Sequence, residues 1–250
     1  MPAARAALGV LRVLAARGGP LRATTLAREL GVPRSSIYQL LAVMRDEGFV
    51  VHYPEDRTYG LSDLVPQLGT AASASERIAR LARPLLERLV ADVAAPVVAH
   101  LAVLGGSDVV YAGRVQGFRA PTTVSAIGVR LPAHLTATGR AMLAALPPAQ
   151  VRALYPSRDQ LIHRNEAGPS TLAELDRLLA DSRRRGWAVE DGDVTPEYAS
   201  VGAAATDRNG YPVAAIGLTY RRDAAVDAER LGVEAVRTAS ALTARLTGRT

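Results

Sequence analysis

The chain has 250 residues, 48% of them apolar and 22% charged, which is typical of a folded protein of one large domain or two smaller ones. All 30 basic residues are arginine and face 24 acidic residues, so the net charge is +6. Because lysine and cysteine are absent, the chain excludes Schiff-base enzymes, P-loop nucleotidases, thiol enzymes and cysteine-ligated zinc sites.

The first predicted element is an amphipathic helix over residues 3–17, which ends at Gly18-Gly19-Pro20. Arginines are scattered through its apolar positions, which argues against a signal peptide. The most apolar stretch, residues 89–106, is interrupted by an acid, a proline and a histidine and is therefore not a membrane span. We expect a cytoplasmic protein that does not enter a membrane.

Residues 24–47 are predicted to form a helix-turn-helix, with Thr24 capping the first helix and Pro33 beginning the second. Ala27 is small where the helices cross, Gly31 takes the left-handed turn, and Ile37 fills the space between the helices. The alternative is a helical hairpin from an unrelated domain. A hairpin over residues 48–61, turning at 54–56, follows in the position of a wing.

In a helix-turn-helix the second helix enters the major groove. Arg34 could pair with guanine and Gln39 with adenine, although Gln39 and Tyr38 could equally lie on the surface or contact phosphate. Arg57, at the tip of the hairpin, would contact the minor groove or phosphates, or stay solvated. The predicted DNA-binding residues are Arg22, Thr24, Arg28, Arg34, Ser35, Ser36, Tyr38, Gln39 and Arg57.

Bulk charge does not explain DNA binding. Residues 1–68 contain eight arginines and six acids, so 8 − 6 = +2 of the net charge lies there and +6 − 2 = +4 lies in the remainder. Affinity for DNA would therefore come from the placement of individual arginines and from dimerisation.

The second half mixes strands and helices. Residues 67–83 are interpreted as a linker, with a helix starting at Glu76 that Pro84 either kinks or restarts. Strands are predicted at 97–103, 109–115, 122–126, 187–190, 200–206 and 213–219, and helices at 136–146, 147–154, 172–186 and 224–247. This order favours an α/β sheet with its helices packed mainly on one side.

A Gly/Pro-rich loop leads into a helix whose first residues are Thr136-Ala137-Thr138-Gly139. Small residues there leave backbone N–H groups open to an anion such as a carboxylate; the alternative is a tightly packed helix start without a ligand. His134 lacks a nucleophile, a paired acid or a metal partner, so a structural role is favoured over a catalytic one. We predict no catalytic residue, metal or cofactor.

Three segments carry a family resemblance. They are LARELGVPRSSIYQLLAVMRDEGFVVHYPEDRTYGL (26–61), GVRLPAHLTATGRAMLA (128–144) and RRGWAVEDGDVTPEYASVGAAATDRNGYPVAAIGLTY (184–220). In this order and spacing the chain resembles the IclR-type bacterial transcriptional regulators over nearly its whole length. The resemblance implies a two-domain α+β protein that is not an enzyme. A winged helix-turn-helix (1–66) and a linker helix region (67–83) would precede a GAF-like α/β domain with a mainly antiparallel sheet (84–250).

The resemblance also implies a homodimer or homotetramer that binds double-stranded operator DNA, as a repressor, and senses a small organic acid or aromatic metabolite. The effector-binding residues it implies are Ala137, Thr138, Glu190, Asp193, Tyr198, Ser200, Gly217 and Thr219. Glu197, where the family has glycine, and Tyr198 could narrow the pocket. Two alternatives stay open: an effector-independent regulator with a vestigial pocket, and an enzyme domain fused to a DNA-binding tether.

Overall fold

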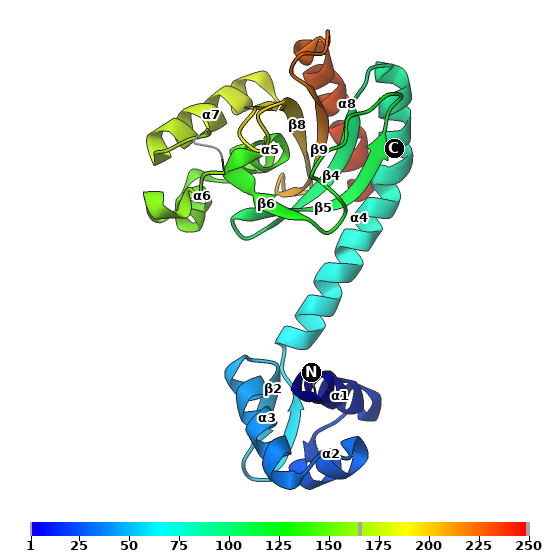
Figure 1. Cartoon of the computed structure of the whole chain (residues 1–250), viewed down its shortest axis with the longest axis vertical. Coiled ribbons are helices and arrows are strands. Elements are labelled where there is room, and N and C mark those ends of the chain that lie inside the picture. Colours follow the sequence, from blue (N-terminus) through cyan, green and yellow to red (C-terminus); the bar gives the residue numbers. More distant parts are fainter. Residues whose placement is uncertain (1, 165–166, 249–250) are drawn as a thin grey trace. The chain divides into compact units, whose positions relative to one another are not determined.

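The computed structural model describes residues 2–164 and 167–248 (Figure 1). The chain divides into two compact units between Ala74 and Ser75. Helix α4 (Leu64–Val93) runs through this boundary as one element. The helix predicted to begin at Glu76 therefore begins twelve residues earlier, because the alanine-rich residues 70–75 favour helix. Pro84 lies inside α4, not in a first turn.

The first unit packs three helices against a small sheet. Its elements are α1 (Pro2–Arg17), β1 (Leu21–Arg22), α2 (Ala23–Leu30), α3 (Arg34–Asp46), β2 (Val50–Tyr53) and β3 (Thr58–Leu61). The core contains Leu14 of α1, Leu26 of α2 and Ile37 of α3, each exposed by at most 1%. The predicted wing is present as the β2–β3 hairpin. Sequence reasoning missed β1, which adds to this hairpin through antiparallel pairing with β3.

The turn between α2 and α3 confirms the predicted role of Gly31, whose φ is 65°. The N–H of Val32 donates to the carbonyl of Ala27 at 3.0 Å, which closes the turn. The predicted cap at Thr24 is wrong. Arg22 is the residue before the helix and makes no side-chain cap. Because Arg22 still pairs with Thr58 in the sheet, the helix starts directly after the strand and places Thr24 in its first turn.

The second unit is built on a six-stranded antiparallel sheet in the order β6-β5-β4-β9-β8-β7. The strands are β4 (Val98–Gly105), β5 (Asp108–Gln116), β6 (Arg130–Pro132), β7 (Ala188–Asp191), β8 (Tyr198–Thr206) and β9 (Pro212–Arg221). The helices are α5 (Ala137–Ala145), α6 (Pro148–Leu154), α7 (Leu172–Arg185) and α8 (Ala228–Thr247), with 3₁₀ turns at Ala133–Leu135 and Arg158–Gln160. The predicted two-part α+β fold with an antiparallel sheet is confirmed.

Helices cover both faces of this sheet, so the prediction that they pack mainly on one side is wrong (Figure 1). Leu101 and Ile216 point to one face, where they share a buried cluster with α4 and α8. Ala102 and Ala215, their neighbours on the same two strands, join the cluster formed with α5, α6 and α7 on the other face. Because successive side chains of a strand point to opposite faces, the central strands are buried on both faces. One layer of helices could not cover them.

The strand predicted at 122–126 is also wrong; the strand beside β5 is β6. Residues 122–126 form a loop held by side chains, since the Ser125 hydroxyl contacts His100 Nε2 at 3.2 Å and donates to Thr123 Oγ1 at 2.9 Å. Within the described residues, no helix is both long enough and apolar enough to cross a bilayer.

Candidate functional site

The exposed face of α3 carries five of the nine residues predicted to bind DNA. Ile37, Leu41 and Met44 recur along one side of the helix and are buried. The rest of its first two turns faces solvent, as expected for an amphipathic helix. The exposed residues there are Arg34, Ser35, Ser36, Tyr38 and Gln39. Their hydrogen-bonding groups therefore lie at the N-terminal end of the helix, the part that contacts bases in helix-turn-helix proteins.

The other four predicted residues are exposed on neighbouring elements: Arg22 on β1, Thr24 and Arg28 on α2, and Arg57 in the β2–β3 turn. Arg22 pairs with Thr58, the residue after Arg57, so the sheet brings these two arginines together. Arg57 has φ 52°, a left-handed conformation that is uncommon for a residue with a side chain. A charged residue thus occupies the hairpin tip at a conformational cost.

These arginines are not neutralised by the protein. Within the described part of the chain, the ion pairs formed by the first unit are Arg17–Glu29 and Arg45–Asp46. Arg22, Arg28, Arg34 and Arg57 take part in none. Their guanidinium groups are therefore free to meet phosphates or base edges.

The second unit contains a small cavity of about 30 Å³ between α5, the sheet and residues 123–125. That is room for about two water molecules. Seven of the eight predicted effector-binding residues line it: Ala137, Thr138, Glu190, Tyr198, Ser200, Gly217 and Thr219. The structure thus brings together residues that are up to 82 positions apart in the chain (219 − 137). Glu197, predicted to narrow the pocket, is exposed and lies outside its lining.

Helix α5 begins at the wall of this cavity. Its first turn is capped and packs closely against the sheet. The Thr136 hydroxyl accepts a hydrogen bond from the N–H of Gly139 at 3.0 Å. A Cβ on Gly217 would lie 2.6 Å from Thr138 Cγ2, so this glycine lets α5 approach the sheet. The buried Thr138 hydroxyl lies near the Tyr111 phenol. It forms no hydrogen bond of acceptable geometry with any described residue.

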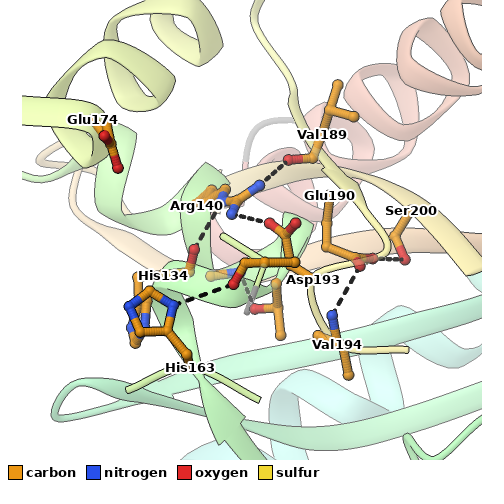
Figure 2. Close-up of polar contacts among 12 residues, drawn as sticks. His134, Arg140, His163, Glu174, Val189, Glu190, Asp193, Val194 and Ser200 are labelled. Atoms are coloured by element: carbon orange, nitrogen blue, oxygen red, sulfur yellow. Dashed lines mark hydrogen bonds and ion pairs between the residues drawn. The ribbon is translucent and has the colours of Figure 1, made fainter. Parts of the chain in front are cut away.

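Glu190 is the carboxyl group of the cavity wall (Figure 2). Its Oε1 accepts from the N–H of Val194 at 3.2 Å, and its Oε2 accepts from the Ser200 hydroxyl at 2.9 Å. Ser200 in turn lies 3.0 Å from the Thr219 hydroxyl. Burial, which disfavours the charged form, raises the pKa of Glu190 to about 7. This acid therefore changes charge within the physiological pH range.

The cavity residues that are absent from the predicted effector-binding set include His100, Tyr111 and Ser125. Burial lowers the pKa of His100 to about 3 and raises that of Tyr111 to about 12, so both are uncharged at neutral pH. The alternation of side chains along the strands was the signal that could have found His100. His100 pairs with Gly217, which was already a predicted pocket residue, and side chains at paired positions point to the same face of a sheet.

Asp193 is the predicted effector residue that the structure places elsewhere. Its carboxylate pairs with Arg140 and does not line the cavity (Figure 2). Arg140 is buried in α5 and also donates to the carbonyls of His134 at 2.7 Å and Val189 at 2.8 Å. A buried arginine needs an acid partner, which turns Asp193 away from the cavity. The Asp193–Arg140 pair therefore joins α5 to the connection between β7 and β8 behind the cavity.

His134 has a structural environment. It is 1% exposed, its Nε2 lies 2.9 Å from the carbonyl oxygen of Ile162, and its ring packs edge-on against Tyr155. Burial lowers its pKa. Among residues 2–164 and 167–248, no cluster of three or more histidine, aspartate or glutamate side chains is arranged to hold a metal ion.

Comparison with known proteins assigns both units. The model of the IclR helix-turn-helix domain matches residues 3–54. The model described as the bacterial transcriptional regulator IclR C-terminal matches residues 70–243. The chain is 26% identical over 226 residues to the HTH-type transcriptional regulator XynR of Escherichia coli (strain K12), covering 89% of this chain and 87% of that protein.

Solved structures agree. The repressor BlcR of Agrobacterium tumefaciens is 30% identical and has a TM-score of 0.61, with 98% of this chain and 97% of that chain covered. An IclR homologue of Microbacterium hydrocarbonoxydans, solved with 4-hydroxybenzoate, shares the fold. It is 21% identical, with a TM-score of 0.61 and 98% of both chains covered.

Proposed function

Because the chain belongs to the IclR family of bacterial transcriptional regulators, which are not enzymes, we propose that it is a ligand-responsive repressor. It binds double-stranded operator DNA as a homodimer or homotetramer in the cytoplasm. It senses a small organic acid or aromatic metabolite in the cavity beside α5. The observation that carries this proposal is that one chain contains both features. Helix α3 exposes an arginine that makes no ion pair with a described residue, and the second unit contains a cavity lined by polar groups.

DNA contact is supported by the surface of the first unit. Arg34, in the first turn of α3, is exposed and makes no ion pair with another described residue. A guanidinium in this position can donate two hydrogen bonds to the edge of one guanine. Arg57, at the tip of the wing, would contact the backbone or minor groove beside it.

Effector binding is supported by the shape and polarity of the cavity. Hydroxyl groups, a carboxyl group and the start of α5 converge on one partly enclosed space, as in small-molecule sites. At about 30 Å³ the space is too small for an aromatic ring. Residues 123–125 form its wall outside the strands, held through the Ser125–His100 contact. A ring-sized effector would displace this wall.

Signal transfer would use α4. Part of α4 packs in the same buried cluster as the sheet, and the helix continues to Leu64 in the first unit. Effector binding that shifts this helix would change the spacing between the recognition helices of a dimer. Half-sites must lie about one helical turn of DNA apart, so a small change in spacing weakens binding. Couplings of this kind are worth roughly 1–3 kcal/mol.

The proposal is tested by measuring affinity for a duplex that the protein selects from a random DNA pool, with and without a panel of aromatic and aliphatic acids. We expect at least one compound to change the dissociation constant by roughly 5- to 150-fold. The same compound should stabilise the protein by roughly 2.7 kcal/mol when present at 100 times its dissociation constant. Sequence-specific binding with no response to any compound would favour the effector-independent regulator.

A further inference from the structure

The charge of the cavity decides what it can hold. Among the described residues that line it, Glu190 is the one carboxyl group, and no arginine lines it. Arg140 lies outside the lining, and three of its five N–H groups make hydrogen bonds within the protein. Its Nε donates to His134 O, its Nη1 to Val189 O and its Nη2 to Asp193. Among the described residues, no guanidinium therefore lines the cavity to receive a carboxylate ligand; Arg114, which pairs with His100 across β4 and β5, lines a different hollow.

The other titratable groups of the lining do not supply positive charge. His100 is neutral at physiological pH because burial lowers its pKa to about 3. Tyr111 stays protonated because burial raises its pKa to about 12. A carboxylate entering the cavity would therefore meet an acid, and the charge that favours it in the lining is the partial charge at the start of α5.

We propose that the cavity selects an uncharged ligand whose hydroxyl or amide N–H donates to Glu190, and that it rejects carboxylate anions unless a proton enters with them. The proposal rests on the function above, in which this cavity is the effector site. Within that function it favours uncharged metabolites, such as phenols, alcohols or amides, over organic acids that enter as anions.

The hydrogen bonds around Glu190 are consistent with such a ligand. A carboxylate can accept about four hydrogen bonds. Glu190 accepts one from the N–H of Val194 and one from the Ser200 hydroxyl. The Thr138 hydroxyl, on another wall of the cavity, is a second group that a ligand oxygen or N–H can reach. A compound that carries a donor and an acceptor on a short frame would engage both.

Among the described lining residues with a shifted pKa, Glu190 is the one whose charge changes between pH 6 and 8.5. Its neighbours are Arg140 of α5, which pairs with Asp193, and the tyrosines of β5 and β9. Burial raises the pKa of both Tyr111 and Tyr220, so neither phenol ionises in this range. If an anion binds only when Glu190 is protonated, its affinity falls about 30-fold from pH 6 to 8.5, given a pKa of about 7.

Two pairs of nearly isosteric probes test the proposal: lactate with lactamide, and 4-hydroxybenzoate with 4-hydroxybenzamide. Binding to the full-length protein would be measured by calorimetry at pH 6 and pH 8.5. We expect the amide to bind about tenfold or more tightly than the acid at pH 8.5. The acid should weaken by about 30-fold over this range, whereas the amide should change less than about threefold.

Two variants locate the effect. Glu190→Gln keeps the shape of the side chain but cannot ionise, so it should bring acid and amide affinities together and remove the pH dependence. Glu197→Gln removes the same charge from an exposed position in the connection after β7, outside the cavity lining, and should behave as the wild type.

Tighter binding of the acid at pH 8.5, or a pH dependence that survives in Glu190→Gln, would overturn this proposal and leave the effector function standing. If neither member of either pair binds the folded protein, the effector function fails together with it. The wild-type comparison of acid and amide decides the matter even if the variant does not fold.

Discussion

Asp193 and Arg140 form a buried ion pair that joins α5 to the connection between β7 and β8 (Figure 2). Their side chains are only 12% and 4% exposed. The pair lies behind the cavity, so it fixes the distance between two of its walls while withholding its charge from any ligand. One contact thus joins two walls of the cavity and holds the Arg140 guanidinium outside its lining.

Removing Asp193 should destabilise the protein strongly. In Asp193→Ala the Arg140 guanidinium stays buried without its acid, which costs about 3–5 kcal/mol in comparable cases. The free energy of unfolding from urea titrations measures this loss. Asp181→Ala is the matched control, because it removes an acid whose pair with Arg184 is exposed, and should cost at most about 1 kcal/mol. Equal losses in the two variants would show that the buried pair has no special weight.

Gly202→Ala should force α5 away from the sheet. A Cβ there would lie 2.7 Å from the carbonyl carbon of Ala137 and 2.8 Å from the backbone nitrogen of Thr138, neither of which can rotate away. We expect a loss of about 1–3 kcal/mol, measured as a lower unfolding free energy. Gly105→Ala in β4 is the control, since its Cβ would meet the flexible end of Arg130 at 3.4 Å. A stable Gly202→Ala protein would contradict the close packing of α5 on β8.

Glu190 should make stability depend on pH. Its pKa is raised from 4.5 to about 7 on folding, so the folded state holds the proton more tightly. The resulting stabilisation is fully present below pH 4.5 and is lost as the pH rises through 7, by an amount of the order of 3 kcal/mol. Unfolding free energies of the wild type and Glu190→Gln should therefore diverge between pH 5 and pH 8. A constant difference between them would mean that Glu190 does not titrate in this range.

Local spacing was sufficient to predict most elements, including the helix-turn-helix. Gly31 and Ile37 act through a turn and a short helix, which local sequence determines. The errors arose where distant contacts decide. β1 exists only because β3 lies beside it, residues 122–126 are held by His100 from another strand, and the helices on both sheet faces reflect a strand order that spacing does not reveal.

The same limit applies to the cavity. The seven predicted residues that line it came from motif resemblance. His100, which was missed, comes beside them through its pairing with Gly217 on β9, a strand far away in the chain. Asp193 was included because the family resemblance implies an effector contact at its position. Only the structure shows that Arg140, 53 residues earlier, takes its charge.

The central claim is that α3 reads DNA, and Arg34 gives the most direct measurement. Duplexes would be selected from a random pool with the full-length protein, and the affinity of the selected sequence compared between the wild type and Arg34→Ala at one salt concentration. Arg158→Ala, which removes an exposed arginine from the second unit, is the control for lost charge.

We predict that the wild type and Arg158→Ala enrich the same sequence, and that Arg34→Ala binds it about 5- to 160-fold more weakly, the equivalent of about 1–3 kcal/mol for one bidentate base contact. Equal affinity in all three proteins, or no enriched sequence for the wild type, would contradict the account.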